Sequence, residues 1–139
     1  SLLAMDKDNA IVYAAGGRGG PEDRWLAELG TRVADTLNLA VLEHERLHFD
    51  IGELYARKLR KELYILFEEK IINHEMYWAK IDSLFSAAST HQAAYDQETR
   101  YGQMRNMQQR WNKRIVRELK QLEDFTFEKM ILRCNEASQ

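Results

Sequence analysis

Cysteine and proline are nearly absent from this sequence, and it has no long hydrophobic run. Cys134 is the only cysteine, which excludes an intrachain disulfide and a zinc site built from cysteines. Pro21 is the only proline, and six of the seven glycines precede residue 53, so little interrupts helices in the rest of the chain. No apolar run approaches the roughly 18 residues of a membrane-spanning helix, and we therefore expect no membrane span.

An excess of one charge is lacking as well. The 20 basic and 22 acidic residues leave a net charge of −2, so electrostatics gives no reason to expect nucleic acid or an anionic membrane as a partner. The 139 residues, 45% of them hydrophobic, are enough for one domain with its own core. The sequence gives no indication of the oligomeric state.

Hydrophobic periodicity predicts a mostly α fold: a single domain over residues 1–139 with a minimal β element near its N-terminus. Residues 8–15 favour a strand, and the glycines at 16–20 favour a loop. Pro21 begins a short helix that we expect to end at Gly30. Residues 1–30 would then hold the β element and the loop, and residues 31–139 the helical part.

A long central helix follows, with Thr31 as its expected N-cap, and continues to at least Lys70. It carries His44-Glu45-Arg46-Leu47-His48, a complete His-Glu-x-x-His motif. Residues four apart share a helix face, so the imidazoles of His44 and His48 can bind one ion. This pattern predicts a Zn²⁺ site, with His44 and His48 as metal ligands and Glu45 as the general base toward a zinc-activated water. An apolar stripe at helical spacing places both histidines on the core face: Val33, Leu37, Val41, Ile51, Tyr55 and Leu59.

The turn after this helix decides which residues can come near the histidines. Ser83 to Thr90 marks one candidate turn, and Asn73 marks a second, weaker one. With reversal at Asn73, the returning chain is level with His48 after about 25 residues, at 96–101, whereas the later turn overshoots. Gly102 is the expected end of the returning helix, and a last helix should run from Met104 through Phe125 toward Ile131.

The histidine motif at 44–51 is followed by a second segment, Tyr95-Asp96-Gln97-Glu98-Thr99-Arg100-Tyr101-Gly102. Together the two segments resemble an uncharacterised bacterial family described as predicted secreted zinc-dependent proteases. The family pairs a His-Glu-x-x-His helix, commonly continued with Asp-Ile, with a later Tyr-Asp-x-x-Thr-x-His-Gly. Residues 49–60 and Trp111-Asn112-Lys113 are similar to versions from Bacteroides-like bacteria. The resemblance, over about residues 37–122, implies a zincin-like fold, a peptide or protein substrate, and a periplasmic or secreted location. Residues 1–7 lack the basic region and cleavage site typical of a signal peptide, so we expect no signal peptide within this sequence.

The family's histidine before glycine, its natural third zinc ligand, is Tyr101 here. Aspzincins carry Asp-x-x-Tyr-Gly with the aspartate as ligand, and Glu98-Thr99-Arg100-Tyr101-Gly102 is similar to that motif with glutamate substituted. The resemblance therefore implies Glu98 as the third metal ligand and Tyr101 as a catalytic residue beside the site. Tyr101, Asp96 and His91 stay open as alternative ligands.

Two other hypotheses compete with a zinc metallopeptidase. A catalytically degenerate zincin scaffold, acting as a helical binding or interaction module, is favoured by Tyr101 and by the shortage of strands. A di-iron bundle would need a second Glu-x-x-His. Ile71 and Ala88 precede His74 and His91 at that spacing, so the sequence does not supply one.

Overall fold

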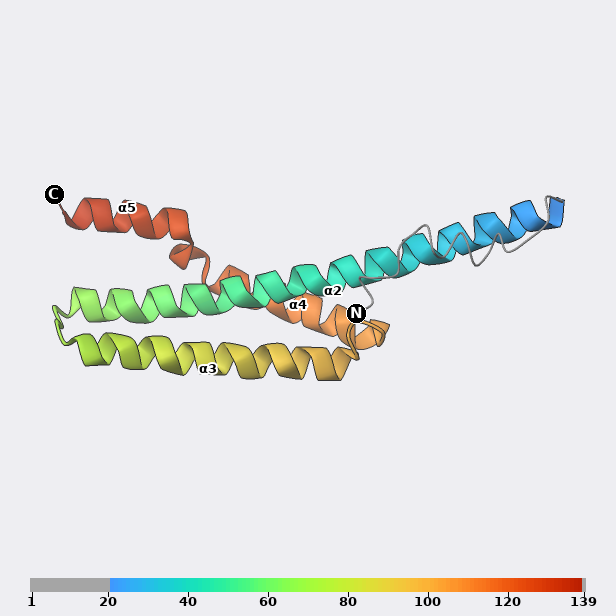
Figure 1. Cartoon of the computed structure of the whole chain (residues 1–139). Coiled ribbons are helices and arrows are strands. Elements are labelled where there is room, and N and C mark those ends of the chain that lie inside the picture. The colour runs from blue at the N-terminus through green and yellow to red at the C-terminus, as the bar shows by residue number, and fades with distance from the viewer. Residues whose placement is uncertain (1–20, 139) are drawn as a thin grey trace. The chain divides into compact units, whose positions relative to one another are not determined.

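The structure, a computed structural model, describes residues 21–138, all of them in helices or the short connections between helices (Figure 1). The helices are α2 (Pro21–Glu68), α3 (His74–Thr99), α4 (Arg105–Gln121), the 3-10 helix η2 (Glu123–Phe125) and α5 (Phe127–Ala137). The prediction of a mostly α fold is confirmed for this part of the chain. The strand at 8–15 and the loop at 16–20 lie outside the described residues.

The chain divides into two compact units, residues 1–45 and 46–139, and the boundary falls inside the continuous helix α2. The predicted short helix ending at Gly30 and the predicted N-cap at Thr31 are wrong, because α2 runs through both residues. The Thr31 hydroxyl instead donates to the carbonyl oxygen of Ala27, 3.0 Å away in the preceding turn. A threonine whose hydroxyl is satisfied in this way fits a helix interior. The first unit is described only by this helical segment.

In the second unit, α2 ends with a left-handed residue, and α3 begins with a side-chain cap. Lys70 has φ 57°, and the Ile71 amide donates to the Leu66 carbonyl at 3.0 Å, a bonding pattern that closes a helix C-terminus. The Asn73 side chain then accepts from the amide of Glu75 at 2.9 Å and caps α3. The reversal therefore lies at residues 69–73, and α3 passes through the serines and threonine at 83–90 without a turn.

The core of the second unit lies where α2, α3 and α4 meet. Its buried members are Leu47, Ile51, Leu54, Tyr95, Trp111 and Ile115. The predicted apolar stripe of α2 is therefore shifted: Leu47 and Leu54 are buried and Val33 is exposed. The shift follows from α4, because Trp111 and Ile115 cover the α2 face that carries Leu47 and Leu54.

Two arginines of α2 bind the end of α4 and the segment after it, and a glutamate of α2 holds both arginines. Arg57 donates to the Leu119 carbonyl at 2.7 Å, and Arg60 donates to the Phe125 carbonyl at 3.0 Å. The Glu53 carboxylate accepts from both arginines. Burial alone would raise the pKa of Glu53, but the hydrogen bonds and the positive charges of the two arginines together outweigh burial, and the pKa is lowered.

The last predicted helix is interrupted. α4 ends at Gln121, η2 follows, and the Thr126 side chain caps α5 by accepting from the Lys129 amide at 3.3 Å. The prediction of one helix from Met104 through Phe125 is therefore wrong, since a cap at Thr126 starts a separate helix. Figure 1 shows α2 and α3 side by side in the second unit, with α4 packed against them.

We expect Ile51→Ala to lower the free energy of unfolding by about 2–5 kcal/mol, because Ile51 is 0% exposed and its removal leaves a cavity among three helices. The same substitution at Ile72, which is 90% exposed, should change it by no more than about 0.5 kcal/mol. Urea unfolding followed by circular dichroism measures both. Equal losses in the two variants would contradict the core described above.

Candidate metal site

The two histidines of the motif lie one turn apart on α2, as the sequence predicts. His44 is 2% exposed, and the His48 side chain is 22% exposed. His48 therefore lies at the edge of the core rather than inside it.

Asp96 on α3 reaches the histidine pair. Its Oδ1 lies 2.7 Å from Nε2 of His48, and one ligand atom each from His44, His48 and Asp96 lies within 4.8 Å of the others. Two imidazoles and a carboxylate match the ligand types of catalytic zinc sites, which have three protein ligands and one open position. Asp96 was one of the alternatives left open for the third ligand, and it is the one that lies beside the histidines.

The imidazole of His48 has a partner at each nitrogen and an aromatic neighbour. Nδ1 lies 2.5 Å from Oε1 of the Gln92 side chain. The amide nitrogen of the same Gln92 side chain donates to the backbone carbonyl of His48 at 2.9 Å. The Tyr95 ring packs against the imidazole edge to face, with centroids 4.8 Å apart. Gln108 of α4 donates to the Tyr95 hydroxyl at 2.7 Å. α3 and α4 thus both help to fix this ring.

Glu98, the expected third ligand, lies outside this group. Its Oε2 accepts from the indole nitrogen of Trp111 on α4 at 2.7 Å. Residues two apart on a helix point about 200° apart, so Asp96 and Glu98 cannot both face α2. In the structure Asp96 faces the histidines and Glu98 faces α4.

His91, another open alternative, belongs to a separate cluster. Its Nδ1 lies 2.8 Å from the hydroxyl of Tyr55, and its ring lies 5.0 Å from that of Trp111. Burial lowers the pKa of His91, and the positive charge of Arg114 lowers it further, while Glu118 opposes the shift. His91 therefore favours its neutral form and stays apart from the metal-ligand group.

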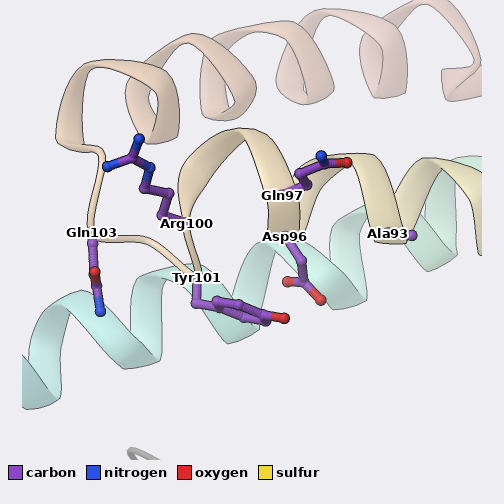
Figure 2. A pocket seen from close by; sticks show the side chains of 6 residues that line it. All are labelled: Ala93, Asp96, Gln97, Arg100, Tyr101 and Gln103. Carbon is purple, nitrogen blue, oxygen red and sulfur yellow. The ribbon is translucent and has the colours of Figure 1, made fainter.

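Tyr101 lies beside Asp96 at the end of α3. Arg100, Tyr101 and Gly102 all have positive φ angles, of 48°, 56° and 89°, so the chain turns sharply after α3. An open pocket of about 400 Å³ is lined by Ala93, Asp96, Gln97, Arg100, Tyr101 and Gln103. Figure 2 shows the side chains of Asp96 and Tyr101 directed to the same side of this segment, and Arg100 directed to the other. Tyr101 is therefore placed to flank a group held by Asp96.

Glu45, the expected base, is exposed on α2 directly after His44. One residue turns a helix by about 100°, so Glu45 lies on the flank of the histidine face. Sequence reasoning did not single out Gln92, Tyr95 or Gln108. The signal for Gln92 was its spacing, because it precedes Asp96 by one helical turn just as His44 precedes His48.

Comparisons with protein-family models, curated proteins and solved structures find no match to this chain. The resemblance to secreted zinc-dependent proteases therefore stays a prediction from two motifs. Among residues 21–138, no helix is long and apolar enough to cross a membrane.

We expect stability to fall as the pH falls through the window just below 6.5, the ordinary pKa of His91. The folded pKa lies below that value, so in this window the unfolded chain binds more protons than the folded one. His91→Gln should reduce the loss of stability between pH 7.5 and 5, measured by urea unfolding in the presence of a chelator. His74→Gln, at the exposed start of α3, is the control and should unfold like the wild type. An unchanged pH dependence in His91→Gln would contradict this account.

Proposed function

We propose that this chain is a zinc-dependent metallopeptidase-like protein that hydrolyses peptide bonds. The observation that carries the proposal is the grouping of His44, His48 and Asp96, whose ligand atoms all lie within 4.8 Å of one another. Zinc held at about 2.0–2.2 Å by tetrahedral ligands separates the ligand atoms by roughly 3.4 Å, so small side-chain adjustments would complete the site. When bound, zinc would lower the pKa of a coordinated water, so that this water could act as a nucleophile toward a carbonyl at neutral pH.

The chain's own residues would divide the remaining work. Asp96 brings a negative charge to two neutral imidazoles, which lowers the net charge of the loaded site. Glu45 would accept a proton from the attacking water and return it to the leaving amine. The phenol of Tyr101, on the pocket that Asp96 lines, would donate a hydrogen bond to the carbonyl oxygen as negative charge develops on it.

The two-motif resemblance supports this reading. Tyr95-Asp96 belongs to the motif that the secreted zinc-dependent proteases pair with His-Glu-x-x-His, and the structure brings Asp96 to His48 across two helices. Membership of that family, a peptide or protein substrate, and a periplasmic or secreted location are all parts of the proposal.

A degenerate scaffold that acts as a helical binding module is the second candidate. The observation that favours it is that both His48 nitrogens have partners within the chain, Gln92 and Asp96. This geometry serves two chemistries: Nε2 either carries a proton that it donates to Asp96, or gives its lone pair to a cation that Asp96 also binds. Metal binding separates the two candidates.

We expect the chain, purified without a histidine tag and offered micromolar zinc, to bind about one zinc ion, because three ligand groups converge. Asp96→Asn should weaken zinc binding by more than about 100-fold, beyond the range of changes to groups that only support a ligand. Glu98→Gln, two residues away and directed to Trp111, should leave zinc binding unchanged. Elemental analysis and chelator competition measure stoichiometry and affinity.

Each alternative has its own signature in this experiment. If Glu98→Gln loses zinc and Asp96→Asn keeps it, Glu98 rather than Asp96 is the third ligand. No zinc in the wild type would leave the binding module as the supported function.

We expect Glu45→Gln to lower the hydrolysis of a dye-quenched protein substrate by about 100-fold or more, because general base catalysis contributes 10²–10⁴-fold. Its zinc content should stay that of the wild type, since glutamine at this position removes no ligand. Glu43→Gln, on the other side of His44, is the matched control and should keep most of the activity. Full activity in Glu45→Gln would remove this residue from the mechanism.

A further inference from the structure

Gln92 of α3 contacts His48 at two points. Its amide oxygen faces Nδ1 of the imidazole, and its amide nitrogen donates to the backbone carbonyl of the same residue. A backbone carbonyl can only accept, so the second contact fixes which way the amide is turned. The oxygen is therefore the atom that faces the imidazole.

An oxygen at Nδ1 determines the role of the other ring nitrogen. An amide oxygen accepts hydrogen bonds, so Nδ1 keeps its proton. A neutral imidazole carries one proton, and with that proton on Nδ1 the free lone pair is on Nε2. Nε2 is the nitrogen that lies 2.7 Å from Oδ1 of Asp96. Gln92 thus makes available the lone pair that faces the carboxylate.

The helix that supplies the carboxylate also supplies the amide. Gln92 and Asp96 lie one turn apart on α3, opposite a histidine pair one turn apart on α2. Tyr95 packs against the same imidazole and is 0% exposed, with its hydroxyl bound by Gln108. The orientation of the His48 ring is therefore set by groups that are themselves held in place.

We propose that Gln92 is a positioning residue that holds the Nδ1–H form of His48 and so presents Nε2 as a ligand for a divalent cation shared with Asp96. This inference rests on the proposed function, since it concerns the same site. Groups that bind the second nitrogen of a ligating histidine typically change metal affinity by about 10- to 100-fold. Gln92 acts through His48 and touches neither the cation nor a substrate.

The test compares zinc affinity in two variants of the full chain, measured by competition with a chromophoric chelator. Gln92→Leu removes the acceptor and should weaken zinc binding by about 10- to 100-fold. Gln92→Glu keeps an acceptor for Nδ1–H and should bind zinc at least as tightly as the wild type. Gln121→Leu, at an exposed position at the end of α4, makes the same change away from the site; it is the control and should leave the affinity unchanged.

A spectroscopic measurement separates positioning from a general loss of structure. In the zinc-loaded chain labelled with ¹⁵N, the Nδ1–H proton of His48 should give a downfield resonance protected from exchange with water. It should persist in Gln92→Glu and vanish in Gln92→Leu, while circular dichroism shows the helical content of the wild type.

The failures of the two proposals differ. A wild type that binds no zinc overturns the proposed function and this inference together. A wild type that binds zinc, beside a folded Gln92→Leu of equal affinity, overturns only the inference. If Gln92→Leu does not fold, Gln92→Glu decides: affinity at or above that of the wild type supports the role, and a tenfold loss overturns it.

Discussion

The short reversal at residues 69–73 is the constraint on which the rest of the second unit depends. Two antiparallel helices rise equally per residue, so the turn fixes which residues lie level. Three contacts between α2 and α3 share this register: Glu62 with Lys80, Tyr55 with His91, and His48 with Asp96. Each pair has its midpoint at residues 71 to 73. A turn ten residues later would have carried a different residue to His48.

That register selects a short window of α3, and helical rotation then selects one residue within it. Asp96 and Glu98 both lie level with the histidines, but only one of two residues separated by about 200° can face α2. Tyr95, which is fully buried and directly precedes Asp96, sets this rotation because its ring packs on Trp111 and on His48. The packing of this fully buried side chain thus determines which carboxylate lies beside the histidines.

Sequence alone could predict the parts governed by local periodicity. The long helix, the histidine pair and the helix end near Gly102 follow from spacing and from single residue types, and the structure has all three. The position of the turn was harder to predict, because its sequence signal is the single residue Asn73, while the serines at 83–90 give a stronger compositional signal. The left-handed backbone of Lys70 is visible only in the structure. The third ligand could not be chosen, because the aspzincin-like motif favours Glu98 and only tertiary packing turns Asp96 toward α2.

The site also shows why a histidine pair on a core-facing helix needs more than apolar neighbours. An imidazole at the edge of a core carries two nitrogens, each of which needs a partner in the protein or in water, and a polar group buried without one is destabilising by about 1–3 kcal/mol. α3 supplies both partners: the amide of Gln92 contacts Nδ1 of His48, and the carboxylate of Asp96, one turn later, contacts Nε2. The amide oxygen of Gln92 faces Nδ1 and the carboxylate of Asp96 faces Nε2, so each helps to fix the orientation of the ring. The contacts that join α2 to α3 at this point therefore also set the direction in which Nε2 of His48 faces, which is the direction that the proposed metal site requires.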